Sequence, residues 1–305
     1  MIDAVQNTLD GLMVGSSYAL LALGFTLTFG VMRRLNLAYG ATIMAGVYLG
    51  TWLTLEHDAG VAAGGSAAVG GAILASLYVE RLCFASLPER AALASMVSSF
   101  AVWMQLEEAA MLALPRHTYP FPALVSGEPL GVVLPWGALA LRLEYLVMLG
   151  SAMAIGAGLY FVLQHTRFGR ALRATTDNAL GARLLGIEVG AMRMRAFALA
   201  AAVGGIAGFL IAATDQQVTP MLGMWTTIKG LVAMMLGGLG SLRGAVAGGL
   251  LLGVVEAHAQ WYFGPQVRDL VAFLLLFACL AVRPAGLLGS ARAGGSHRPP
   301  GGGRG

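Results

Sequence analysis

A few ionisable residues lie inside long apolar stretches of this chain, where charge is uncommon. Lys229 is the only lysine among the 305 residues, and Glu107, Glu108 and Glu256 lie in two other apolar stretches. Charged side chains in hydrocarbon are costly, so they pair, line a polar path or reach toward water. The place of Lys229 near the outer end of a short segment favours the last of these, with its ammonium at the membrane interface. The alternative is that Lys229 pairs with a glutamate.

The sequence lacks the common motifs of catalytic chemistry. It contains no GxxxxGK[ST] phosphate loop, no HExxH, no paired-cysteine motif and no GxSxG turn. The five histidines are scattered, and Cys83 and Cys279 lie far apart in or beside apolar runs. We interpret both cysteines as small hydrophobic residues. We therefore expect no catalytic residue, no metal site and no cofactor bound by this chain.

The composition is typical of an integral membrane protein. Hydrophobic residues make up 57% of the chain, charged residues only 11%, and the mean hydropathy is +0.75. A soluble domain has about a quarter charged residues. The net charge of +4 is small. Since the cations group at the ends of apolar segments, they indicate orientation in a bilayer rather than nucleic-acid binding.

Nine apolar segments are candidates for helices that cross the membrane, which requires about 20 residues each. They are 9–31, 37–55, 61–84, 91–114, 145–163, 196–213, 226–239, 245–263 and 270–282. The segment 226–239 is short, so it either crosses or is a broken or re-entrant element buried in protein. We predict an all-α, polytopic membrane protein with eight to nine transmembrane or re-entrant helices in a single domain, 1–289.

The arginines give this topology an orientation. Six of them lie between Thr166 and Arg195, and an excess of arginine in a loop is typical of the cytoplasmic side. We therefore place the basic insert, 164–194, in the cytoplasm. Nine alternating crossings then put the N-terminus outside and the C-terminus in the cytoplasm. The first helix is retained, because acidic residues precede it where a signal peptide would have basic ones.

Two segments are not expected to be long helices. The extracytoplasmic loop 115–143 contains several prolines and glycines, which predict an ordered loop with turns. The tail 290–305 is rich in Gly, Pro and Arg and has no apolar face, so we predict a disordered cytoplasmic tail.

Glycine is abundant, with 43 residues, and often recurs at GxxxG spacing. Helices in lipid associate by close backbone approach, which small residues at this spacing allow. We take the pattern collectively as evidence for a tightly packed bundle. Candidate packing or hinge positions are Gly237, Gly238, Gly240 and Gly244.

Within the basic insert, the sequence predicts a short capped helix. Asp177 or Asn178 can cap its N-terminus, and Gly186 ends it, with Ile187 placed for the apolar contact of a C-terminal cap. Leu180, Leu184 and Ile187 fall at helical spacing on one side of this helix. It is therefore a candidate surface for another protein; the alternative is that it rests on lipid headgroups. Earlier in the insert, Arg167, Arg170 and Arg173 are expected to anchor the fifth helix at the inner headgroups.

Four sequence strings together resemble the permease subunits of ATP-binding-cassette importers of the branched-chain amino acid type. They are GLMVGSSYALLALGFTLTFGVMRRLNLAYG (11–40), TRFGRALRATTDNALGARLLGI (166–187), KGLVAMMLGGLGSLRGAVAGGLLLGVVE (229–256) and RPAGLLG (283–289). They occur in the family's order and span about 280 residues.

The resemblance implies a function and a set of partners. Such a chain forms half of a translocation pathway in the bacterial inner membrane, beside a second permease that is a copy or a relative. Two cytoplasmic ATPases use ATP, and an extracytoplasmic solute-binding protein delivers branched-chain or other amino acids. The family's coupling helix, which docks on the ATPase, corresponds to Asp177, Asn178, Ala182, Arg183, Leu184, Leu185 and Gly186.

Some positions depart from the family or leave alternatives open. Leu180 stands where the family usually has an acidic residue in the coupling helix. Asn36 matches a family position after the first helix, and Asn36, Glu107 and Lys229 are candidate pathway residues, Lys229 as a contact for the carboxylate of a passing amino acid. Relatives that move urea and short amides, and an ion-coupled secondary transporter using the membrane acids, are the alternative functions.

Overall fold

The computed structural model describes residues 2–57, 60–88, 91–114, 118–124, 130–134 and 137–289. Its helices are α1 (Ile2–Met32), α2 (Tyr39–Glu56), α3 (Val61–Val79), the π-helical turn η1 (Glu80–Ala85), α4 (Ala92–Ala113), α5 (Leu143–His165), α6 (Arg167–Asp177), α7 (Ala179–Leu184), α8 (Val189–Asp215), α9 (Leu222–Gly237), α10 (Leu242–Phe263), the 3-10 turn η2 (Pro265–Val267) and α11 (Arg268–Val282). Every apolar segment predicted from the sequence contains a helix. The predicted disordered tail, 290–305, lies outside the described residues.

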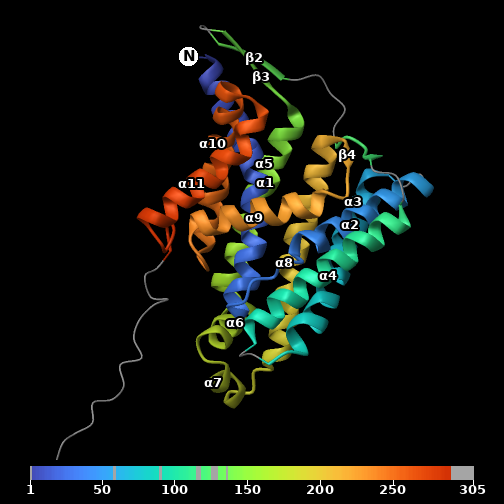
Figure 1. The fold of residues 1–305 in the computed structure, drawn as a ribbon, viewed down its shortest axis with the longest axis vertical. Helices are drawn as coiled ribbons and strands as arrows, with labels where there is room; N and C mark the ends of the chain where they lie inside the picture. The colour runs from blue at the N-terminus through green and yellow to red at the C-terminus, as the bar shows by residue number, and fades with distance from the viewer. Residues whose placement is uncertain are drawn as a thin grey trace, which may run out of the picture.

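The long helices connect two ends of the molecule (Figure 1). The N-terminus and the hairpin of β2 (Leu130–Leu134) and β3 (Gly137–Leu141) lie at one end, and α6 and α7 lie at the other. Helix α9 runs across the middle of the bundle, at a steep angle to α1 and α8 (Figure 1). This separation places the loop 115–143 and the basic insert at opposite ends, as the predicted alternation requires.

The basic insert is more helical than the sequence predicted. Its first part forms α6, and α8 begins at Val189, inside the range 164–194 that was predicted to be a loop. In this early part of α8, the Nε atom of Arg193 forms an ion pair of 2.6 Å with the carboxylate of Glu80 in η1. Arg193 is thereby held inside the bundle, and the loop ends at Glu188.

The loop 115–143 has strands as well as turns. The short strands β1 (Tyr119–Pro120) and β4 (Gln217–Val218) pair antiparallel and join this loop to the end of α8. Strands β2 and β3 form a two-stranded antiparallel hairpin with Leu130 opposite Leu141. No helix occurs among the described residues between α4 and α5, which agrees with the predicted loop, although the sequence did not indicate its strands.

Glycines bring α1 and α10 into backbone contact. A Cβ atom on Gly253 would lie 2.3 Å from the Cα of Gly15, and one on Gly15 would lie 2.9 Å from the carbonyl oxygen of Gly249. Such distances allow no side chain on either helix. The GxxxG spacings here therefore serve packing within the chain, as the collective interpretation predicted.

The four candidate packing glycines cluster where α9 meets α10. A Cβ atom on Gly237 would lie 2.0 Å from the carbonyl oxygen of Gly244, so these two positions are in direct backbone contact. Gly238 and Gly240 have φ values of 110° and 81°, which other residues rarely adopt. The segment between the two helices is thus a tight glycine turn.

Residues 283–289 complete the C-terminal end of α9. The backbone N–H groups of Leu287 and Leu288 donate to the carbonyl oxygens of Leu236 and Gly237, at 2.9 and 3.0 Å. Helix-terminal carbonyls otherwise lack partners within the helix. The RPAGLLG string is therefore a cap supplied from the far end of the chain.

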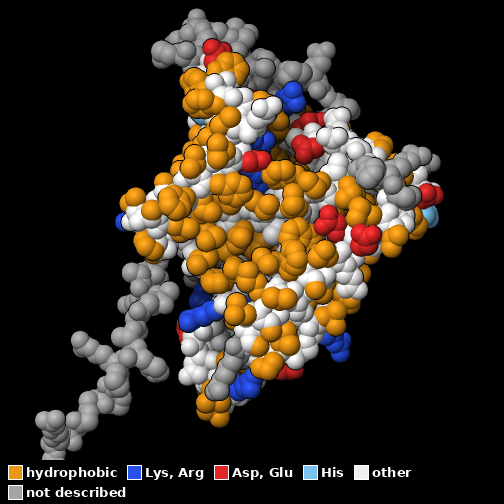
Figure 2. Space-filling view, in the orientation of Figure 1, with side chains coloured by type: hydrophobic (Ala, Val, Ile, Leu, Met, Phe, Trp, Pro, Cys, Tyr) orange, Lys and Arg blue, Asp and Glu red, His pale blue; other side chains and the backbone are white. Residues whose placement is uncertain are grey.

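Six helical stretches in the described part of the chain are long and apolar enough to cross a membrane, judged by length and composition. They are Asp3–Met32, Val61–Ala85, Leu143–His165, Val189–Asp215, Leu242–Phe263 and Pro265–Val282. The face in Figure 2 carries a broad field of hydrophobic side chains, and the charges gather mostly above and below it. The chain is a multi-spanning, all-α membrane protein.

We expect Gly253→Ala to destabilise the protein by about 1–3 kcal/mol, because the new methyl group would force α1 and α10 apart. Gly150→Ala in α5 is the control, since nothing lies within 4 Å of its Cβ position. The thermal midpoint of the detergent-purified protein should fall for Gly253→Ala and stay level or rise for Gly150→Ala. Equal midpoints for the two variants would contradict the close crossing.

Candidate functional site

A charge network, buried at its centre and partly exposed at Arg268 and Asp269, joins α9, α10 and α11. The ammonium of Lys229 in α9 forms ion pairs with the carboxylates of Glu256 in α10 and Asp269 in α11, the latter at 2.6 Å. The second carboxylate oxygen of Glu256 accepts from the Nε of Arg268 at 2.7 Å. Tyr18 in α1 donates to this same oxygen at 2.9 Å.

A sharp turn after α10 builds this network. Gly264 has a φ of 92°, and Pro265 follows it at the start of η2, so the chain reverses and α11 returns beside α10. The reversal places Arg268 and Asp269, both in the first turn of α11, against Glu256. An acidic residue in the first turn also suits the positive end of the helix dipole.

The position of Lys229 corrects the favoured prediction. Lys229 is only 7% exposed and Glu256 only 1% exposed. The lysine therefore does not reach an interface; it pairs inside the protein, which was the alternative. The two cations and two carboxylates of the network have a net charge of zero. Because removing one member of a buried pair leaves an uncompensated charge, each member depends on the others.

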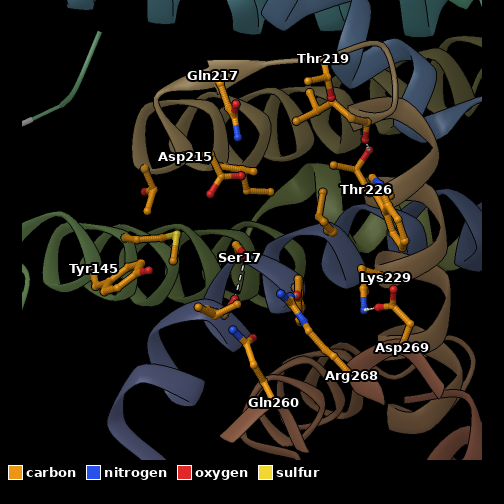
Figure 3. Close-up of a pocket in the computed structure, with 18 of the residues that line it drawn as sticks. Ser17, Tyr145, Asp215, Gln217, Thr219, Thr226, Lys229, Gln260, Arg268 and Asp269 are labelled. Atoms are coloured by element: carbon orange, nitrogen blue, oxygen red, sulfur yellow. Dashed lines mark hydrogen bonds and ion pairs between the residues drawn. The ribbon is translucent and has the colours of Figure 1, made fainter. Parts of the chain in front are cut away.

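The network forms one side of a cavity of about 570 Å3. Figure 3 shows Lys229, Arg268 and Asp269 on one side of this space and Asp215, Gln217 and Thr219 on the other. Apolar side chains of α1, α8 and α9, among them Leu21, Ile211 and Leu222, complete the lining. In Figure 2 the surface is hollowed between the hydrophobic field and the end that carries the N-terminus, and basic and acidic side chains meet in the hollow.

Two other candidate pathway residues lie away from this cavity. Asn36 is 1% exposed, and its side-chain oxygen accepts from the backbone N–H of Ala38 at 3.1 Å, so it shapes the turn between α1 and α2. Glu107 is partly buried in α4. Neither residue lines the cavity beside Lys229. Their assignment to the pathway stays a prediction.

The short helix in the basic insert forms as its sequence predicts. The side chain of Asn178 caps α7 by accepting from the backbone N–H of Gly181 at 2.9 Å. At the other end, Gly186 has a φ of 78°, and the N–H groups of Gly186 and Ile187 donate to the carbonyls of Arg183 and Ala182 at 3.0 Å each. This is the paired C-cap that glycine favours.

The surface of α7 exposes large apolar side chains. Leu180, Leu184 and Leu185 are 70%, 82% and 80% exposed, whereas Ala182 is only 2% exposed and faces the rest of the protein. Arg183 is also exposed. We call these three leucines with Arg183 the α7 tip. Ile187, predicted to share the side of Leu180 and Leu184, instead packs against the core.

Arg173 links α6 to the end of α5. Its Nη1 atom donates to the carbonyl of Leu163 at 2.6 Å and to Gln164 at 2.9 Å, so Arg173 fastens α6 onto the end of α5. Thr166 caps α6 by accepting from the N–H of Gly169 at 3.2 Å. These contacts hold α6, which directly precedes α7, against the end of α5. Headgroup anchoring by Arg167, Arg170 and Arg173 stays a prediction.

Comparison with known proteins decides the family. Residues 7–280 match the sequence profile of the permease component of branched-chain amino acid transport systems. The chain belongs to this family.

Named permeases of this family are similar over nearly their whole length. The high-affinity branched-chain amino acid transport system permease protein LivH of Escherichia coli strain K12 is 29% identical over 294 residues, covering 93% of this chain and 95% of LivH. BraD of Pseudomonas aeruginosa, a permease protein of the same description, is 31% identical over 293 residues with the same coverage. A solved inward-facing structure of a putative metal-chelate type ABC transporter aligns with a TM-score of 0.47 and 13% identity, covering 91% of this chain and 83% of that chain.

Sequence reasoning missed several residues of the permease's charge network. Arg268, Asp269 and the cavity residue Asp215 were not singled out as site residues, and Tyr18 was only a part of the apolar segment 9–31. One signal was present, because Arg268 and Asp269 come three and four residues after Pro265, at the start of an apolar segment. Oppositely charged neighbours at the start of an apolar helix indicate that the helix start faces protein rather than lipid.

We expect Glu256→Gln to destabilise the permease by about 3–5 kcal/mol, because it leaves Lys229 and Arg268 without a full counter-charge in a buried place. The thermal midpoint of the purified protein measures this. Glu108→Gln, on an exposed position of α4, should change the stability by less than about 0.5 kcal/mol. Adding Lys229→Met to Glu256→Gln should recover part of the loss. A Glu256→Gln protein as stable as the Glu108→Gln control would contradict the network's role.

We also expect Gly186→Ala to loosen α7, because its φ of 78° costs a residue with a Cβ about 1–2 kcal/mol. Trypsin should then cut after Arg183 faster than in the wild type. Gly190→Ala is the matched control, since Gly190 lies in α8 with nothing within 4 Å of its Cβ position. Unchanged cleavage in Gly186→Ala would show that the C-cap does not hold α7.

Proposed function

We propose that this chain is the transmembrane permease subunit of an ATP-binding-cassette importer and forms half of its translocation pathway. The observation that carries the proposal is the family match over residues 7–280. We propose branched-chain or other amino acids as the solute, because relatives that align over 93% of this chain are described as branched-chain amino acid permeases. Urea and short amides are the alternative solutes.

In this proposal the α7 tip docks on a separate cytoplasmic ATPase. Three leucines at least 70% exposed are costly in water, and an apolar groove on a partner would remove them from it. Arg183 beside them adds a charge that can steer the contact. ATP is used by the partner, and this chain binds no cofactor of its own. The absence of an acidic residue at Leu180 makes the tip more apolar than is usual in the family.

The proposed assembly contains two permeases, two ATPases and one extracytoplasmic solute-binding protein. The second permease is a copy of this chain or a relative. We propose eight to nine transmembrane or re-entrant helices, with α2, α4 and the oblique α9 added to the six helices that are long and apolar enough by themselves, and we count α9 as a crossing for the orientation. This puts the N-terminus outside and the C-terminus in the cytoplasm of a bacterial inner membrane. The opposite placement of α6–α7 and the N-terminus (Figure 1) supports it.

An ion-coupled secondary transporter is the competing function. It would use the membrane acids to carry protons or ions. Glu256 is engaged by two cations and Tyr18, so a proton would have to displace several partners to reach it. This observation favours the importer, in which the network holds helices together.

We expect the double variant Arg183→Glu and Leu184→Asp to lose most of its co-purification with the ATPase subunit and most of its ATP-dependent uptake of labelled leucine. Both changes place negative charge on the docking surface without altering the cap residues Asn178 and Gly186. Glu188→Gln, an exposed neighbour outside the tip, should keep both activities.

Two results would contradict the proposal. Undiminished ATPase binding by the double variant would remove the docking role of α7. Uptake by the chain alone, driven by a proton gradient with no ATPase present, would establish the secondary transporter instead.

A further inference from the structure

The cavity beside the charge network has one carboxylate that forms no ion pair or hydrogen bond with the described residues. Lys229, Arg268, Glu256 and Asp269 balance one another. Asp215, at the end of α8, also lines the cavity, yet it forms no ion pair or hydrogen bond with the described residues. Its side chain is exposed to the open space. Asp215 is therefore free to receive a cation from a ligand.

The opposite wall offers an anion partner. Arg268 donates through Nε to Glu256 and through Nη2 to Tyr18, whereas its Nη1 atom has no hydrogen-bond partner among the described residues. Figure 3 shows Asp215 and Gln217 pointing into the space from one wall and Arg268 and Gln260 from the wall facing it. Lys229 is less available to a ligand, because both of its carboxylate partners already surround it.

Between these charges the lining is apolar. Leu21, Ile211 and Leu222 come from three different helices and line the same space. The volume of about 570 Å3 falls within the range of small-molecule sites, about 300–1,000 Å3. The cavity thus offers an acceptor for a cation, a donor for an anion and an apolar wall. These three features are complementary to a zwitterion with a hydrocarbon side chain.

We propose that this cavity is a binding site for a zwitterionic apolar amino acid inside the permease itself. Asp215 accepts hydrogen bonds from the ammonium of the ligand, the Nη1 of Arg268 donates to its carboxylate, and the aliphatic side chain lies against Leu21, Ile211 and Leu222. The inference rests on the proposed transport of amino acids and adds that the permease, and not only a separate binding protein, recognises the two charged groups of the solute. The Glu256 and Tyr18 contacts act as positioning groups for Arg268.

The test is a direct titration of the full chain in lipid nanodiscs with 13C-labelled leucine, followed by NMR. The amine-free analogue 4-methylpentanoate and the carboxylate-free analogue 3-methylbutylamine are titrated in parallel. Wild-type protein should bind leucine more tightly than either analogue. Asp215→Asn should weaken leucine binding about tenfold to a hundredfold, the usual contribution of one charge-assisted hydrogen bond. It should leave 4-methylpentanoate binding unchanged, since that ligand has no ammonium.

Glu56→Gln is the matched control, because it removes an exposed carboxylate that does not line the cavity, and it should bind leucine as the wild type does. A wild-type protein that does not bind leucine, or an Asp215→Asn protein that binds it equally well, would overturn the inference. The leucine titration involves neither an ATPase nor uptake. Its failure is therefore distinct from failure of the proposed function, which is tested by ATPase co-purification and uptake with the α7-tip variant. Asp215 forms no ion pair or hydrogen bond with the described residues, so Asp215→Asn should keep the thermal midpoint of the wild type, which checks that the variant is folded.

Discussion

A charge buried among membrane helices must find its counter-charge within the protein, and Glu256 is where this constraint is met. Its two carboxylate oxygens separately engage Lys229 and Arg268, so one side chain of α10 holds both α9 and the start of α11. Lys229 then extends the contact to Asp269. The oblique course of α9, the return of α11 and the shape of the adjoining cavity all depend on this arrangement. Hydrophobic contacts alone would favour no single orientation of such helices, because helices in lipid gain little from apolar burial against one another.

Glycine makes the same arrangement geometrically possible. Gly249 and Gly253 let α10 lie directly on the backbone of α1, and Gly244 and Gly248 let it lie equally close to α9. Helix α10 is thus in contact along two sides, and Glu256 enters a space that is already narrow. Tyr18 fills this space from α1 and contributes its hydroxyl to Glu256. Close packing and charge pairing therefore support one another at α10.

Local features of the fold could be predicted from the sequence, whereas distant pairings could not. Asn178 and Gly186 were recognised as the ends of α7 because capping involves only neighbouring backbone atoms. The long helices could be located from the length of each apolar segment, which is also a property of neighbouring residues. The partners of Lys229 lie 27 and 40 residues away, and nothing in an apolar pattern specifies which helices meet. The start of α8 was missed because Arg193 resembles a loop residue until its partner Glu80, 113 residues earlier, is known. Helix α6 was missed because its arginines masked the apolar face that packs on α5.

The cap on α9 has a consequence for how the protein is made. The last carbonyls of α9 receive their hydrogen bonds from Leu287 and Leu288, which are synthesised after α10 and α11 have been completed. During translation, the carbonyls of Leu236 and Gly237 therefore lack these hydrogen-bond partners until nearly the last described residues have been made. Until then the turn at Gly238, whose Cα lies against Gly286 in the finished protein, has an open side. The backbone hydrogen bonds in the middle of the bundle are therefore completed by a seven-residue string that follows the last described helix.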